Sequence, residues 1–445
     1  MLDSYTIIFA ACGALTVALY YATQVPKTSS DASSLDSKRT PEFDTFQRTW
    51  LGVYLLAMFS DWLQGPYAYA LHSSLGFTSS QIAILSLVGF GSSMIFGTFV
   101  GSISDSIGRK KMSLVFVLLY TLAALTKLSS AYSILCIGRV LSGIATSLLF
   151  SVFEAWMVCA HNKRKFPAEL ISDTFSKATA GNGLCAVFAG LVADQLCAYW
   201  GFAAPFVFAC VPLVILGVIV HLYWDENTGV DSNTPENDPT ARKSIIQQLL
   251  EIFQTTPHIL ALGLAQSLFE GAMYTFVFLW SPTLSDVTTL PGKDLPYGRI
   301  FATFMVMISF GSYLFGYIVR NFDILIIPFI IHALAGFSMV LASWLAHTNE
   351  FIVLAFFLLF EMTCGMFWPT YGTLRSAHIQ EAQRATVSTI FRIPLNLFVV
   401  VLLFQTDKLS SQTMFIICGC AHFGSLLCYS LFYFKSQQAK SAKTD

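Results

Sequence analysis

Thirteen long apolar runs constrain this chain more than any other feature of its sequence. A membrane-spanning helix needs about 20 mainly apolar residues, and runs of roughly this length occupy 5–22, 46–65, 81–101, 112–127, 133–158, 175–198, 203–224, 257–280, 298–319, 324–346, 350–371, 386–406 and 412–434. Nothing in these runs alternates with the period of two that is typical of outer-membrane barrel strands. The sequence therefore predicts an all-α integral membrane protein.

The supply of charged residues excludes most other classes of protein. Only 11% of the 445 residues are charged and 55% are hydrophobic, whereas soluble domains carry about 25% charged residues. A chain of this composition cannot cover a water-exposed surface, which excludes a soluble enzyme, a disordered scaffold and a nucleic-acid-binding protein. We expect the lipid bilayer to be its main partner.

The basic residues of the loops predict the orientation in the membrane. If the N-terminus lies outside, the inner loops receive eighteen Lys and Arg residues and the outer loops receive four, which is a strong positive-inside bias. Only Asp3 precedes the first apolar run, so that run resembles a retained anchor more than a cleaved signal peptide. We expect a multi-pass protein of the plasma membrane with a cytoplasmic C-terminus.

A polar stretch divides the chain into two related halves. Residues 225–256 are rich in Asn, Asp, Pro and Thr, which is typical of a cytoplasmic linker. The predicted organisation is an extra N-terminal anchor at 1–25, six-helix bundles at 46–224 and 257–435, and a cytoplasmic tail at 436–445. Matched short motifs occur in the same order in the two halves: Gly91-Ser92 with Gly311-Ser312, Arg139 to Gly143 with Glu361 to Gly365, and Thr174 to Lys177 with Thr389 to Arg392. Carriers are commonly built from such repeats.

The loop after the second run of the first half carries a recognisable motif. Gly101, Asp105, Gly108, Arg109, Lys110 and Lys111 stand in the pattern G-x-x-x-D-x-x-G-R-[RK]-[RK], which resembles the signature of the major facilitator superfamily. Physically, Gly101 would allow a close approach of two helices, Asp105 would accept charge-assisted bonds at a helix end, and Gly108 would permit a tight reversal. The resemblance implies a gating role for this loop.

Longer stretches resemble the molybdate-anion transporter family of that superfamily. They are Asp61 to Tyr67, Gln81 to Leu85, Leu125 to Ser129, Phe153 to Trp156, Phe166 to Glu169 and Ala265 to Glu270. The resemblance covers nearly the whole chain, including the extra N-terminal run. It implies two six-helix bundles with one additional N-terminal transmembrane helix, and a molybdate substrate. We expect a monomer.

Ionisable residues within the apolar runs are the candidate functional residues. A charge at membrane depth costs at least ~2.5–3.5 kcal/mol, so such residues are functional candidates by default. Asp61 and Glu270 are predicted near the middle of their runs, and Arg139 and Glu361 belong to two further runs that line the central cavity in the superfamily. Lys177, Arg392 and Glu154 are predicted near the cytoplasmic ends, where an ion pair with Glu154 could close an inner gate.

These residues predict a mechanism. Arginine suits a tetrahedral dianion because its guanidinium donates two parallel hydrogen bonds. We expect substrate to bind at Arg139, Lys177, Arg392, Asn182, Asn396, Gln64 and Tyr67, protons to be carried by Asp61, Glu270 or Glu361, and gating to involve Glu154 with the motif residues Gly101, Asp105, Gly108 and Arg109. Fully ionised, the four acids and three bases sum to −1, and protonation of two acids would make the set attractive to an oxyanion.

Two alternatives stay open from the sequence. The carrier could move another solute, such as sulfate or an organic anion, or the fold could serve a non-transporting receptor or scaffold. An enzyme is not expected, because H-E-x-x-H, G-x-S-x-G and phosphate-binding glycine loops are missing from the sequence. The cysteines lack metal-ligand spacing, so we expect neither a metal nor a cofactor.

Overall fold

The computed structural model describes residues 3–23, 39–228, 257–288, 295–346, 349–379 and 381–444. For residues 257, 381–390 and 439–444 it describes the backbone alone. Helices account for almost all of these residues, and none of them forms a β-strand. The predicted linker at 225–256 lies outside the described residues from position 229 onward.

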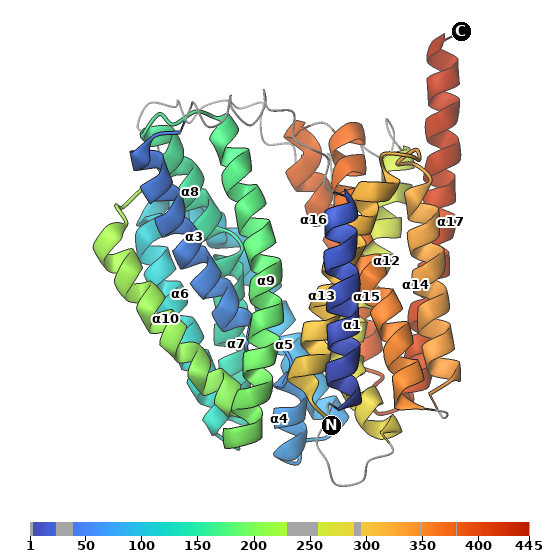
Figure 1. The fold of residues 1–445 in the computed structure, drawn as a ribbon, viewed down its shortest axis with the longest axis horizontal. Helices are drawn as coiled ribbons and strands as arrows, with labels where there is room; N and C mark the ends of the chain where they lie inside the picture. The colour runs from blue at the N-terminus through green and yellow to red at the C-terminus, as the bar shows by residue number, and fades with distance from the viewer. Residues whose placement is uncertain are drawn as a thin grey trace. The chain divides into compact units, whose positions relative to one another are not determined.

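The first of two compact units consists of Gln24–Thr234 together with Pro296–Ala302, and we call it the N-terminal unit. Its described helices are α3 (Pro41–Trp62), α4 (Ala68–Ser74), α5 (Ser79–Ile107), α6 (Arg109–Leu125), the 3-10 helix η1 (Thr126–Leu128), α7 (Tyr132–Leu149), α8 (Val152–Lys163), α9 (Glu169–Trp200) and α10 (Ala204–Tyr223). Helix α7 packs against α5 and α6, and α3 packs against α9 and α10 (Figure 1).

The second unit contains Pro235–Leu295 and Thr303–Asp445 together with Met1–Thr23, and we call it the C-terminal unit. Its described helices are α1 (Ser4–Thr23), α12 (Pro257–Val287), most of α13 (Tyr297–Ile318), α14 (Ile327–Trp344), α15 (Glu350–His378), α16 (Glu381–Leu403) and α17 (Ser411–Thr444). Helix α17 packs against α12 and α14 and extends beyond its neighbours at the C-terminal end (Figure 1).

The predicted N-terminal anchor is a helix that packs on the C-terminal unit. The Tyr5 hydroxyl donates a hydrogen bond to Glu350 at 3.2 Å, and the rings of Tyr20 and Tyr313 meet edge to face with centroids 5.2 Å apart. These contacts place α1 beside α13 and α15, so α1 packs as part of the C-terminal unit.

Eleven helices of the described chain are long and apolar enough to cross a membrane, against thirteen predicted runs. The helices at the two remaining positions are α3 and α16. Helix α3 starts with Glu42 and Asp44 and carries Arg48 and Asp61, which lower its mean hydropathy. In α16 the apolar part is limited to Phe391–Leu403. Both elements are present, but neither is a uniform apolar run.

The matched motifs of the two halves make matched helix contacts. A Cβ atom on Gly143 of α7 would lie 2.4 Å from the Gly89 carbonyl oxygen of α5, and one on Gly365 of α15 would lie 2.0 Å from the Ile308 carbonyl oxygen of α13. Only glycine permits so close an approach of two backbones. The two units therefore repeat one tight helix pair at corresponding positions of the sequence.

The helices bury aromatic and aliphatic side chains inside each bundle and leave others outside. In the N-terminal unit Trp50, Phe116 and Phe153 are fully buried. On α10, by contrast, Val214 and Leu222 are 55% and 66% exposed. An apolar outer face of this kind is suited to lipid contact and would be unstable in water.

Candidate functional site

The superfamily-like motif forms the turn between α5 and α6. Gly108 has a φ of +113°, a conformation that residues with a Cβ rarely adopt, so the predicted tight reversal is present. The Arg109 guanidinium donates two hydrogen bonds to Asp105, at 2.7 and 3.1 Å, and a third to the Ala155 carbonyl of α8 at 3.1 Å. Arg109 thereby fixes the turn to α8.

Glu226 completes this turn, and the sequence did not single it out. Its carboxylate accepts hydrogen bonds from the backbone N–H groups of Lys110 at 2.9 Å and Lys111 at 3.3 Å, at the N-terminus of α6. A Cβ on Gly108 would lie 2.5 Å from this carboxyl group. The acid that caps the helix is therefore Glu226, while Asp105 is bound by Arg109.

The close helix approach predicted at Gly101 is not found among the described residues. Among the described residues, no heavy atom of another element lies within 4 Å of the position that a Cβ would take there. The close approach of α5 to a neighbouring helix occurs at Gly89 and Gly143 instead, because those residues face each other across the α5–α7 contact.

We expect the Glu226→Ala variant to lose about 0.5–2 kcal/mol of stability, as helix caps do, because two backbone N–H groups lose their acceptor. The measurement is the thermal midpoint of the purified protein in detergent. Asp225→Ala is the matched control, because the Asp225 side chain is 85% exposed and its ion pair with Arg164 is 3.5 Å long. Equal midpoints for the two variants would contradict the capping role.

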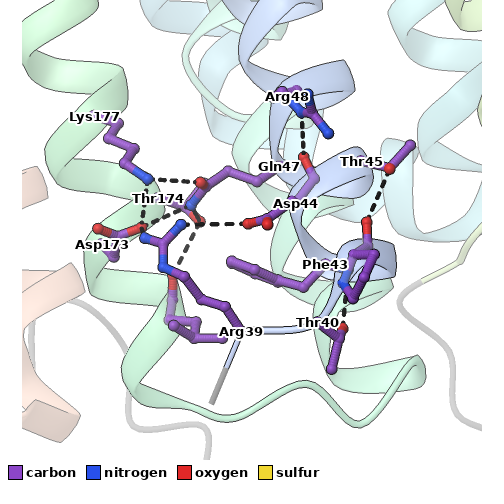
Figure 2. Close-up of polar contacts among 12 residues, drawn as sticks. Arg39, Thr40, Phe43, Asp44, Thr45, Gln47, Arg48, Asp173, Thr174 and Lys177 are labelled. Atoms are coloured by element: carbon purple, nitrogen blue, oxygen red, sulfur yellow. Dashed lines mark hydrogen bonds and ion pairs between the residues drawn. The ribbon is translucent and has the colours of Figure 1, made fainter. Parts of the chain in front are cut away.

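Lys177 belongs to a polar network between α3 and α9 (Figure 2). Its ammonium group lies 3.0 Å from Asp173 and donates a hydrogen bond to Gln47 at 2.8 Å. Asp173 also pairs with Arg39 at 2.6 Å and accepts a hydrogen bond from Gln47 at 2.9 Å. Lys177 is therefore neutralised by Asp173 in this conformation.

The predicted pairing of Lys177 with Glu154 is not present. Glu154 is exposed in the first turn of α8, and no ion pair of the described chain includes it. The fourth predicted run is broken between Leu149 and Val152 and then continues to Lys163. We predicted that Glu154 ends this segment. In the structure it follows the break, and α8 continues for nine residues beyond it.

Asp61 lies closer to a helix end than predicted. Helix α3 begins at Pro41 and ends at Trp62, so Asp61 is about 30 Å along its axis at 1.5 Å per residue. It accepts a short hydrogen bond from the Tyr120 hydroxyl of α6. The predicted run continues to residue 65, whereas α3 ends at Trp62, so Asp61 is the last residue but one of the helix.

Arg139 of α7 lies within electrostatic range of Tyr120 on the neighbouring α6. Within the described part of the chain, the Arg139 Nε is buried without a hydrogen-bond partner, and no ion pair includes this residue. Asp61, Tyr120 and Arg139 thus form one group. In this group Asp61 accepts a hydrogen bond from Tyr120, and Arg139 has no counterion among the described residues.

Three other candidate residues of the N-terminal unit are engaged in hydrogen bonds. The Gln64 amide donates to the Ser60 carbonyl at 3.1 Å, and Asn182 accepts from the Trp62 indole at 2.8 Å. The Tyr67 hydroxyl donates to Asp194 at 3.2 Å. Of these, Tyr67 and Asn182 connect the region after α3 to α9.

Asp194 forms a buried ion pair that sequence reasoning missed. Its carboxylate lies 2.8 Å from Arg299 in the first turn of α13, with the two side chains 8% and 19% exposed. Beside this pair, Gly190 and Gly298 approach so closely that a Cβ on Gly298 would lie 2.4 Å from the Gly190 carbonyl oxygen. Both contacts lie within the N-terminal unit, to which Pro296–Ala302 belong.

The candidate acids of the C-terminal unit have separate surroundings. Glu270 accepts a hydrogen bond from Gln266 at 2.7 Å and interacts with the positive charges of Arg375 and Arg392. Glu361 is 6% exposed and is hydrogen-bonded by Cys364 one turn further along α15. Arg392 is exposed and Asn396 is partly buried on α16. The structure thus brings Arg392 into electrostatic range of Glu270, whereas Glu361 interacts with Cys364 of its own helix.

A buried polar group in the same unit was also missed. His332 of α14 lies 2.6 Å from the Tyr371 hydroxyl and 3.1 Å from the Ser425 hydroxyl of α17. Histidine and serine in an apolar run give no sequence signal, because their partners are supplied by other helices.

Comparison with known proteins agrees with these features. A family model described as sugar transporters with 12 transmembrane helices, MFS_5, matches residues 4–353. The molybdate-anion transporter of Xenopus tropicalis is 36% identical over 418 residues, which cover 91% of this chain and 88% of that protein. The one from Takifugu rubripes is 35% identical over 383 residues, covering 80% and 78%.

Solved transporter structures share the fold. A D-xylose-proton symporter superposes with a TM-score of 0.66 at 14% identity, covering 88% of this chain and 97% of that one. The POT family transporter PepTSo gives a TM-score of 0.68 at 11% identity, covering 90% and 99%. The predicted fold class is confirmed, as is the expectation that the chain is a transporter and not an enzyme.

Proposed function

The chain belongs to the molybdate-anion transporter family of the major facilitator superfamily, and from this premise we propose that it imports molybdate by secondary active transport. The observation that carries the proposal is Arg139, whose guanidinium has no counterion among the described residues of the N-terminal unit. An unpaired arginine in a membrane helix is costly unless it has a ligand. A tetrahedral dianion would supply both the charge and the acceptors.

Proton coupling is the second part of the proposal. A dianion that enters against a negative-inside potential of 100 mV pays about 4.6 kcal/mol, at ~2.3 kcal/mol per charge. Import with two or more protons cancels that electrical work. Asp61, Glu270 and Glu361 are the proposed carriers. Glu361 is the most deeply buried of these acids. Asp61 accepts a hydrogen bond from Tyr120, which lies within electrostatic range of Arg139.

Alternating access requires gates, and one ion pair suits that role. On the predicted outer side, the Asp194–Arg299 pair holds the first turn of α13 on α9. On the predicted inner side, Asp173 of α9 and Gln47 of α3 hold the Lys177 ammonium within the N-terminal unit. Release of Lys177 from Asp173 would make its charge available to the anion in the inward-facing state, with Arg392 as the counterpart from α16.

We expect the charge reversals Asp194→Arg and Arg299→Asp each to lower molybdate uptake at least about tenfold, because breaking a buried ion pair costs about 3–5 kcal/mol. The combined swap should recover much of the uptake. Initial rates in vesicles, normalised to the amount of folded protein, measure both effects.

The exposed pair Arg164–Asp225, at 3.5 Å, is the matched control for this cycle. Its reversal should change uptake little, since exposed ion pairs contribute about 0–1 kcal/mol. Independent and additive losses at positions 194 and 299, without recovery in the swap, would contradict the gate.

The orientation, the location and the oligomeric state complete the proposal. We propose an external N-terminus, a cytoplasmic C-terminus, a plasma-membrane location and a monomer as the transporting unit. The basic triplet from Arg109 to Lys111, together with Lys163, Arg164 and Lys165, supports the assignment of the inner face.

Purified protein in vesicles tests the coupling. A pH-sensitive dye inside the vesicles should report acidification when molybdate is added outside. A negative-inside potential should slow uptake only if fewer than two protons enter with each molybdate dianion. Sulfate and organic anions added as competitors test the alternative substrates. Uptake that ignores both the pH gradient and the potential would contradict proton coupling.

A further inference from the structure

The Arg139 side chain is one member of a larger basic group, which we call the basic cluster: His72 of α4, Lys127 of η1 and Arg139 of α7. Lys127 is 5% exposed and His72 is fully buried. Among the described residues, the Lys127 ammonium, both ring nitrogens of His72 and the Arg139 Nε have no hydrogen-bond partner. The Ala68 carbonyl approaches the His72 ring without reaching hydrogen-bond geometry.

The backbone brings these residues together. A Cβ on Gly138 would lie 1.9 Å from the Thr126 hydroxyl, so η1 abuts α7 at the residues that precede Lys127 and Arg139. A Cβ on Gly89 of α5 would lie 3.6 Å from the Arg139 Cδ, and α4 packs against α5. The positive charges of Lys127 and Arg139 both act on His72, and the charge of Arg139 acts on Lys127, so the three groups lie within electrostatic range of one another.

In the described part of the chain, the cluster contains no acid to balance it. The groups that act on Lys127 are Arg139 and the Cys136 thiol, and those that act on His72 are Arg139 and Lys127. The carboxylate of Asp61 is bound by Tyr120, which stands toward Arg139. Burial and neighbouring like charges both disfavour the charged form of a basic group. A bound anion would counteract both effects and favour the charged, hydrogen-bond-donating forms.

We propose that the basic cluster is a binding site for an inorganic tetrahedral dianion, the class to which molybdate and sulfate belong. This inference rests on the proposed function and specifies its site: the partners of Arg139 are Lys127 and His72. The guanidinium can donate two hydrogen bonds, and the ammonium and imidazole N–H groups can serve the remaining oxygens. Because η1 joins the predicted outer ends of α6 and α7, the site captures the anion from outside.

The test is molybdate binding by the intact protein in lipid nanodiscs, followed by calorimetry and by the rise in thermal midpoint. Lys127→Met should weaken binding at least about tenfold, the equivalent of one charge-assisted hydrogen bond. Without ligand, this variant should be at least as stable as the wild type, because a buried unpaired ammonium is replaced by an apolar chain of similar length. Lys127→Arg should retain part of the affinity, and His72→Gln should weaken it.

Lys163→Met is the matched control, since Lys163 is an exposed lysine in the last turn of α8, and the affinity of this variant should equal that of the wild type. Unchanged molybdate affinity in both Lys127→Met and His72→Gln overturns the inference even if the wild type transports molybdate. If the wild type binds sulfate but not molybdate, and Lys127→Met loses that binding, the site stands while molybdate fails as the substrate. If the wild type binds neither anion, the inference is overturned. The proposed function is then tested separately, by the uptake of labelled molybdate.

Discussion

The Arg139→Gln variant is expected to lose molybdate uptake by at least about a hundredfold, the equivalent of two charge-assisted hydrogen bonds at about 1.5–3 kcal/mol each. The guanidinium has no counterion among the described residues of the N-terminal unit, so its removal breaks no ion pair there and should leave the fold intact. Initial uptake rates in vesicles, with the amount of folded protein determined by gel filtration, measure the loss. Arg139→Lys should restore only a small part, because an ammonium cannot donate two parallel bonds.

Arg48→Gln controls for the loss of a positive charge from the same unit. Arg48 is exposed and donates a hydrogen bond to the Asp44 carbonyl of its own helix at 3.1 Å, so this variant should transport normally. Normal uptake by Arg139→Gln would remove Arg139 from the transport path. Aggregation of Arg139→Gln would instead assign the residue to folding, which contradicts a role in binding the anion.

The second large effect is expected from Gly365→Ala, a change of one methyl group. The added Cβ would lie 2.0 Å from the Ile308 carbonyl oxygen, so the backbones of α13 and α15 must separate. Overpacking typically costs about 1–3 kcal/mol and more where the obstacle is backbone, which in a unit of about 220 residues corresponds to a fall in thermal midpoint of at least about 2–6 °C. The midpoint in detergent measures this loss, and the yield of folded protein should fall with it.

Gly372→Ala is the matched control on the same helix. Among the described residues, nothing lies within 4 Å of the Cβ position at Gly372, and alanine favours a helix over glycine by about 1 kcal/mol. This variant should therefore be as stable as the wild type or slightly more stable. Equal midpoints for Gly365→Ala and Gly372→Ala would contradict a tight contact of α13 with α15 at Gly365.

The fold was largely predictable because its signals are local. Apolar length and charge scarcity identify a membrane helix wherever it occurs. They are less accurate at α3, where the charged residues Glu42, Asp44 and Arg48 obscure the first turns of the helix, which begins at Pro41 and not at residue 46. The matched glycine motifs predicted the repeat, and Gly143 and Gly365 make corresponding contacts. Gly101, for which a similar close approach was predicted, has open space around it among the described residues.

The candidate site was less predictable because its contacts join distant parts of the chain. Arg139 stands out by its charge in an apolar run, but Lys127 looks like an ordinary residue of an outer loop and His72 gives no signal. Glu226 and Asp194 act on residues 116 and 105 positions away, which no local pattern encodes. Charge predicts that a residue matters, whereas packing decides which partner it receives, as Lys177 shows by pairing with Asp173 instead of Glu154.

Uptake of labelled molybdate into vesicles that contain only the purified protein is the decisive measurement for the proposed function. We predict accumulation above the level of protein-free vesicles, driven by an inward proton gradient and lost in Arg139→Gln. Equal labelling of vesicles with and without the protein, under a gradient and with folded protein verified, would contradict molybdate import by this chain.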